Sequence, residues 1–284
     1  MLDFKYHITS IVAVFLALAL GILLGSVIVD KGIIAEQQQA LINSVKADVK
    51  QIQEENRSLK KELDDANQLQ GGIFPLVVQE RLSQKNIVFI SSSLVSDTLK
   101  ETLSESVEKA GAKSLHIRIS AISVLDDPKK KSRLASFFPE ENLSDDELKS
   151  KLIEEIAVEL ATPSNKTLLK ELIDLEILEM KGDGSLPANG FVFIGADLSK
   201  FDPEIIDLPL IGKLKEFGLP LVAVEVEKVS NSSIPLYQNA GISTVDNVDA
   251  LSGRVSLVYT LRGVFGNFGV KPSAEKLLPI GISK

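Results

Sequence analysis

The sequence contains no cysteine, no tryptophan, only two histidines and only two methionines. Without cysteine the chain can form neither a disulfide framework nor a thiolate metal site. Proteins on either side of a membrane can lack cysteine, so this absence excludes chemistries without assigning a compartment.

Positive charge is scarce as well, because 31 lysines and arginines stand against 39 acidic residues, for a net charge of −8. The basic residues form no cluster interleaved with aromatic side chains, which a nucleic-acid-binding surface usually needs. A nucleic-acid-binding function is therefore set aside.

One long apolar run is present near the start of the chain. Between Ile8 and Val29 there is no charged residue. A helix of that length, at about 1.5 Å per residue, can cross a hydrocarbon core of about 30 Å. A cleaved signal peptide is the alternative, but its apolar stretch is usually shorter, and neither SVIVDKG nor GIIAEQQ offers a good cleavage site. The run predicts a membrane anchor that is retained.

Two glycines in this run, Gly21 and Gly25, have G-x-x-x-G spacing. This spacing places two positions without side chains on one helix face, where a second helix can approach closely. Glycine is also common in membrane helices generally, so the motif depends on the segment that follows.

That segment has a heptad pattern. One series of positions holds Ala35, Ile42, Val49, Asn56, Leu63 and Gln70, and the other holds Gln38, Val45, Ile52, Leu59 and Ala66. Valine and isoleucine in the first series with leucine in the second favour two parallel strands, and a buried Asn56 would fix their register. Glu55 and Lys60 then flank the seam and can pair between chains.

The pattern predicts a parallel homodimer through the membrane helix and a coiled coil. Its interface residues are Gly21, Gly25, Ile42, Val45, Val49, Ile52, Asn56, Leu59 and Leu63. Because the ends of the seam are poor, a lone amphipathic helix is one alternative, and a coil shared with a different protein is another.

The expected organisation has four parts: a short tail (1–7), a transmembrane helix (8–29), a coiled coil (30–70) and a globular domain (71–284). Flanking charges barely favour either orientation. A short tail before a first apolar span and a long downstream domain is the usual layout of a signal-anchor. We therefore expect a cytoplasmic N-terminus and an extracytoplasmic domain.

The globular part is predicted to be an α/β domain, Rossmann-like or doubly wound, with a mostly parallel sheet. After a predicted turn at Gly71–Gly72 and Pro75, strands and helices alternate. The strand segments are KNIVFISSS, KSLHIRIS, GFVFIGAD, PLVAVEVE and ISTVDN, and the helices are SDTLKETLSESVEKAG, DPEIIDLPLIGKLKEFG and VDALSGRVSLVYTLRG. A helical insertion is expected at about 126–184, with a charged PKKKSR loop, a helix at SDDELKSKLIEEIAVELA and a second helix through TLLKELIDLEILEM.

Ligands of open α/β sheets bind beyond the carboxyl ends of the strands. The polar residues expected there are Ser91 to Ser93, Asp197, Glu225, Glu227, Asp246 and Asn247. The loop SSSLVSD contains no glycine, which argues against a nucleotide phosphate loop.

Catalysis has little support in the sequence. The two histidines are His7, beside the membrane, and His116, which is expected to be a packed or surface residue of a strand rather than a base. A carboxylate pair among Asp197, Glu225 and Asp246 stays open, although Asp246, Asn247 and Asp249 are better explained as caps of the helix that follows.

Two stretches, DFKYHITSIVAVFLALALGILLGS near the N-terminus and STVDNVDALSGRVSLVYTLRG followed by FGVKPSAEKLLP near the C-terminus, resemble the MctB family. The family name implies copper transport or an outer-membrane channel. Some relatives, called SteB, are instead thought to act in cell separation with a SteA partner that works from the cytoplasmic side. The resemblance therefore implies two different classes of function.

The residues favour one of these classes. Cu(I) prefers cysteine and methionine ligands, then histidine, but this chain offers only Met1, Met180, His7 and His116, far apart in sequence. The single apolar span also lacks polar groups to line a pore. We therefore expect a non-enzymatic, dimeric envelope scaffold without cofactor or metal, with membrane lipid as a partner. The family resemblance further implies a SteA-like protein and peptidoglycan hydrolase regulators as partners. Copper handling or channel activity, as the family name implies, is the alternative, and an enzyme or small-ligand binder using Ser92, Asp197 and Asp246 remains open.

Overall fold

The computed structural model describes residues 3–30, 33–120, 127–138, 143–163, 166–182 and 187–279. It divides into two compact units, Met1–Gln68 and Leu69–Lys284. The second unit is called the head below, and each unit is described by itself.

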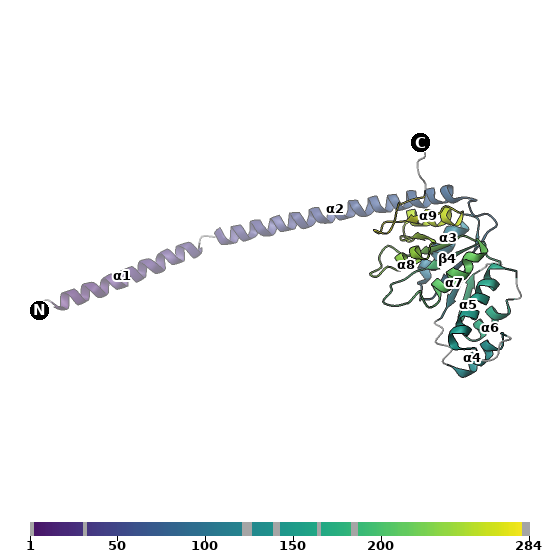
Figure 1. Ribbon diagram of the computed structural model, residues 1–284. Helices are drawn as coiled ribbons and strands as arrows, with labels where there is room; N and C mark the ends of the chain where they lie inside the picture. Colours follow the sequence, from purple (N-terminus) through teal and green to yellow (C-terminus); the bar gives the residue numbers. More distant parts are fainter. Residues whose placement is uncertain are drawn as a thin grey trace. The chain divides into compact units, whose positions relative to one another are not determined.

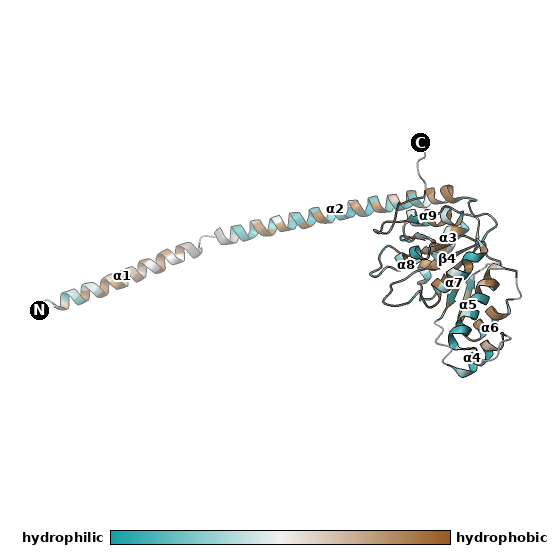
Figure 2. Cartoon of the chain, in the orientation of Figure 1, coloured by the Kyte–Doolittle hydropathy of each residue, from teal (hydrophilic) through white to brown (hydrophobic). Residues whose placement is uncertain are grey.

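The first unit contains helix α1 (Asp3–Asp30) and most of helix α2 (Ile33–Val78). Among the described residues, Phe4–Val27 is the one helical stretch long and apolar enough to cross a membrane. Apolar residues run along α1, whereas hydrophilic residues predominate in the part of α2 that lies in this unit (Figure 2). The predicted membrane helix thus begins a turn earlier than expected.

Helix α2 continues through Gly71–Gly72 to Val78, so the predicted turn at these glycines is wrong. Pro75 lies inside the helix and has no N–H to donate to the carbonyl one turn earlier. Phe74 and Val78 are buried in the head, with 2% and 0% of their surface exposed. Burial of these two side chains stabilises the last turns and offsets the poor helix propensity of two glycines and a proline.

The head is built on a seven-stranded sheet with the order β3-β2-β1-β4-β5-β6-β7. The strands are β1 (Asn86–Ser91), β2 (Lys113–Ile119), β3 (Leu178–Gly182), β4 (Gly190–Ile194), β5 (Leu221–Val224), β6 (Ser243–Val245) and β7 (Asn267–Phe268). Strand β3 runs antiparallel to β2, and the other neighbours are parallel. The predicted strands β1, β2, β4, β5 and β6 are confirmed.

Helices cover both faces of this sheet (Figure 1). The remaining helices are α3 (Asp97–Glu108), α4 (Pro128–Ala135), α5 (Asp145–Ala161), α6 (Thr167–Asp174), α7 (Asp207–Leu214) with a 3-10 turn (Lys215–Phe217), α8 (Ile234–Asn239) and α9 (Leu251–Leu261). The end of α2, with α3 and α9, packs on one face, and α4 to α8 pack on the other. Because both faces are covered, β1, β4 and β5 read as continuous apolar runs.

The insertion differs from its prediction in two places. The charged segment at 128–135 forms helix α4, because Asp127 accepts a hydrogen bond from the backbone N–H of Lys129 and Pro128 suits a first helical turn. The helix expected through Met180 ends at Asp174, and the chain turns at Glu176 (φ 59°) into β3. Pairing with β2 overrides the helical propensity of this leucine-rich sequence. Parts of the predicted insertion lie outside the described residues.

Candidate functional site

Glu225 stands directly after β5, at the carboxyl edge of the sheet, and is fully buried. Its Oε2 accepts a hydrogen bond from Ser232 Oγ at 2.5 Å, and its Oε1 accepts from the N–H and Oγ of Ser233, each at 2.9 Å. The Nζ of Lys271 completes the site as an ion pair and also donates to the Val226 carbonyl at 3.0 Å. A buried carboxylate needs this degree of pairing.

Asp246 follows β6 and binds the same C-terminal segment. Its carboxylate accepts hydrogen bonds from the backbone N–H groups of Val270 (2.8 Å) and Lys271 (3.0 Å). Gly269 lies so close that a Cβ there would stand 1.9 Å from Asp246 Oδ1. Residues 269–271 therefore lie against Asp246 at the carboxyl edge of the sheet.

The predicted capping role of the acids before α9 is wrong. The N-cap of α9 is Ala250, which makes no side-chain cap bond. Asp249 instead accepts from the Glu227 N–H (2.9 Å), and Asn247 Nδ2 donates to Ser252 Oγ (3.0 Å). Asn247 Oδ1 lies beside Gly253 in the first turn of α9 but has no hydrogen-bond partner among the described residues.

Ser92, Asp197 and Asp246, which could have formed a joint site, have separate partners. Ser92 Oγ donates to Asp207 at 2.8 Å. The exposed Asp197 accepts from the Ser199 N–H at 2.9 Å and from Asn231 at 3.3 Å, and these bonds lower its pKa.

The partner of Ser92 is itself buried. Asp207, at the start of α7, also accepts a hydrogen bond from Tyr237 Oη at 2.5 Å. Burial raises the pKa of Asp207 to about 6, while the bonds from Tyr237 and Ser92 act in the opposite direction. Nothing local in the sequence indicates this cluster, because its three residues are distant in the chain.

His116 on β2 packs as predicted for a strand histidine. Its ring stacks on Phe89 at a centroid distance of 4.6 Å, and its Nε2 lies 2.8 Å from Ser104 Oγ. Burial of the ring, followed by the charges of Lys100 and Lys181, lowers the pKa of His116 to about 4. The imidazole is therefore neutral at physiological pH and a weak base, and it shares a hydrogen bond with the Ser104 hydroxyl.

The two soft metal ligands of the head, His116 and Met180, lie on opposite faces of the sheet. Met180 on β3 is the register partner of Ile117 and packs in the core of one sheet face, whereas His116 stacks on Phe89 on the other. Met1 lies outside the described residues. Across the described part of the chain, no group of three or more His, Cys, Asp or Glu is placed to hold a metal ion.

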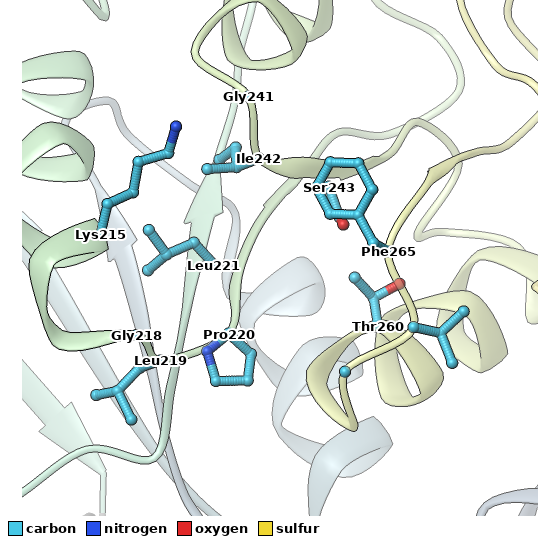
Figure 3. Close-up of a pocket in the computed structure, with 12 residues that line it drawn as sticks. Lys215, Gly218, Leu219, Pro220, Leu221, Gly241, Ile242, Ser243, Thr260 and Phe265 are labelled. Atoms are coloured by element: carbon cyan, nitrogen blue, oxygen red, sulfur yellow. The ribbon is translucent and has the colours of Figure 1, made fainter.

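A shallow hollow of about 330 Å³ lies at the opposite, amino edge of the sheet, where β5 and β6 begin. Lys215, Leu221, Thr260 and Phe265 border it (Figure 3). Phe265 is 73% exposed, and Lys215 Nζ donates to the Ala240 carbonyl. The hollow presents mainly apolar groups, and Lys215 is the one ionisable side chain among the described residues that line it.

The predicted interface residues lie on the long helices. The apolar seam residues of α2 are about half exposed in the single chain: Ile42 46%, Val45 51%, Val49 47%, Ile52 55%, Leu59 62% and Leu63 61%. Asn56 Nδ2 donates a hydrogen bond to the Ile52 carbonyl at 2.9 Å, and the side-chain oxygen of Asn56 takes no part in this bond. Gly21 and Gly25 have open space where a Cβ would stand. These surfaces are accessible to a partner.

A family model described as "Copper transport outer membrane protein, MctB" matches residues 1–279. The chain belongs to the MctB family. The resemblance seen in the sequence is thereby confirmed, and no curated protein matches the chain. MctB membership and the apolar helix α1 together support a membrane-anchored protein.

In this MctB protein the two C-terminal stretches that suggested the family lie together. Asp246 comes from the first stretch, and the N–H groups that it binds, at Val270 and Lys271, come from the second. The two stretches are thus joined by the hydrogen bonds of Asp246 at the carboxyl edge of the sheet.

Proposed function

We propose that this MctB protein is a single-pass, dimeric, non-enzymatic scaffold of the cell envelope, with a cytoplasmic N-terminus and an extracytoplasmic head. The observation that carries the proposal is the exposed apolar seam of α2, with the polar Asn56 at its centre. Exposed apolar stripes on a long helix mark surfaces that a second helix covers. A parallel coiled coil of two copies is the partner that the heptad spacing favours.

The chemistry of the head supports a scaffold rather than an enzyme. Glu225, Asp246 and Asp207 use their hydrogen-bonding capacity within the head. We also infer that the head is doubly wound and Rossmann-like, because β2 and β4 lie on opposite sides of β1. A SteA-like protein and peptidoglycan-remodelling factors, implied by the family resemblance, are the partners proposed for the scaffold in cell separation.

Copper handling is the second candidate, and the printed description of the family favours it. The placement of His116 and Met180 on opposite faces of the sheet argues against a shared Cu(I) site between them. A Cu(I) titration of the purified full-length protein distinguishes the scaffold from copper handling. The scaffold proposal expects no saturable site, and stoichiometric binding would favour copper handling.

Asn56 provides a direct test of the dimer. Asn56→Leu is expected to raise the thermal stability of the coil and to loosen its oligomeric specificity, because a buried amide trades stability for register. Sedimentation of the detergent-solubilised full-length protein should show dimers before the change and additional, larger species after it. A protein that is monomeric at all concentrations in both forms would contradict the homodimer.

The scaffold role is tested by affinity purification from native membranes with mass spectrometry of the recovered proteins. A seam variant, Val49→Glu with Ile52→Glu, is compared with a matched variant off the seam, Ser44→Glu with Gln51→Glu. We expect a SteA-like protein or wall-remodelling factors with the wild type and with the matched variant, and a loss of at least one of them with the seam variant. Recovery of metal-handling proteins alone would contradict the scaffold.

A further inference from the structure

The last turns of α2 carry apolar residues on two sides of the helix. Phe74 and Val78 are buried in the head, whereas Leu69, Ile73 and Leu76 are 65%, 42% and 75% exposed. Since each residue turns the helix by about 100°, the exposed stripe lies roughly opposite the buried pair. Leu69, Ile73 and Leu76 are called the outer stripe below.

The outer stripe has the spacing of a helix–helix contact. Its members stand at i, i+4 and i+7, and Ile73 is the next position of the heptad series that contains Leu59 and Ala66. Gly72 lies between Leu69 and Leu76 on this face, and a Cβ there would meet open space. The stripe therefore offers side-chain knobs beside a hole.

The charge of this segment favours a copy of itself as the occupant. From 66 to 79 the chain has no charged residue, whereas the preceding part of α2 is densely charged. At the centre of a parallel two-fold contact identical residues face one another, so a charge there would meet its own sign. An uncharged apolar stripe avoids this repulsion.

We propose that the outer stripe packs against the outer stripe of a second copy, so that the dimer contact extends past the coiled coil into the head. The two heads then lie on opposite sides of the paired segments 69–78, because each head covers the other face of its own segment. This inference rests on the proposed dimer and adds a contact that the dimer does not require.

Because the chain has no cysteine, single engineered cysteines report this contact without a background. Ile73→Cys and Leu76→Cys probe the outer stripe, Val49→Cys probes the coil, and Gln68→Cys is the control, exposed and about 100° away from the stripe. Each full-length variant is oxidised with diamide in native membranes and run on a non-reducing gel. All four changes are at exposed positions, so the fold is expected to be kept.

The proposal expects disulfide-linked dimers with Val49→Cys and Ile73→Cys, with several-fold less product from Gln68→Cys. If Val49→Cys forms disulfide-linked dimers but Ile73→Cys and Leu76→Cys give no more product than the control Gln68→Cys, the head contact is overturned and the dimer is kept. A cross-linked band at Ile73 and Leu76 with the mass of another protein would also overturn it. No product at Val49, Ile73 or Leu76 would overturn the dimer and the contact together.

Discussion

Gly253→Ala is expected to destabilise the head by about 3 kcal/mol or more, a cost typical of severe overpacking. A Cβ at this position would stand 2.0 Å from the carbonyl oxygen of Asn247 and 2.7 Å from its Oδ1. Asn247 is buried, and its carbonyl accepts the N–H of Ala250 at 2.9 Å. Helix α9 would therefore have to move away from the end of β6.

Hydrogen–deuterium exchange of peptides from β5 and β6 in the full-length protein measures this loss. A change of 3 kcal/mol corresponds to exchange roughly a hundredfold faster for amides that exchange through opening of the head. Gly212→Ala in α7 is the matched control, because a Cβ there meets nothing within 4 Å. Alanine at an open helical position is expected to stabilise by up to about 1 kcal/mol. Equal exchange in the two variants would contradict the close packing at Gly253.

Lys271→Met is expected to cost about 3–5 kcal/mol, because removing one partner of a buried ion pair leaves the other charge uncompensated. Glu225 is fully buried, and Lys271 is 13% exposed. The remaining donors to Glu225 are the hydroxyl and backbone groups of Ser232 and Ser233, which carry no charge. The effect is measured by urea unfolding of the full-length protein, with hydrogen–deuterium exchange of the β5 amides as the readout.

A second change separates the ion pair from simple loss of packing. Adding Glu225→Gln to Lys271→Met removes the buried charge, so the double variant should recover at least about 1 kcal/mol relative to the sum of the single losses. Lys109→Met, which breaks an exposed pair with Glu105, should change stability by no more than about 0.5 kcal/mol. Additive losses at Glu225 and Lys271 would contradict a coupled pair.

Elements with a strong local pattern were predictable from the sequence. The run NIVFIS gave β1 and GFVFI gave β4, because strands buried on both faces need continuous apolar side chains. Ser96 before α3 and Ser144 before α5 cap their helices with side-chain bonds, a signal that is contained within a few residues.

Elements that depend on distant neighbours were predicted wrongly or missed. Strand β3 has a helical leucine pattern and is a strand because Leu178–Gly182 pairs with β2. Strand β7 contains two residues and exists through its pairing with β6. The turn expected at Gly71–Gly72 is replaced by helix because Phe74 and Val78 insert into the head.

The sequence by itself determined the apolar helix, the heptad seam of α2, the mostly parallel α/β head and the family. These depend on the order of apolar and polar residues along the chain, which sets helix and strand periodicity. Only the tertiary structure decided the roles of Glu225, Asp246 and Asp207. Their partners Lys271, Val270 and Tyr237 are tens of residues away, and no local pattern encodes which distant donor a buried carboxylate will meet.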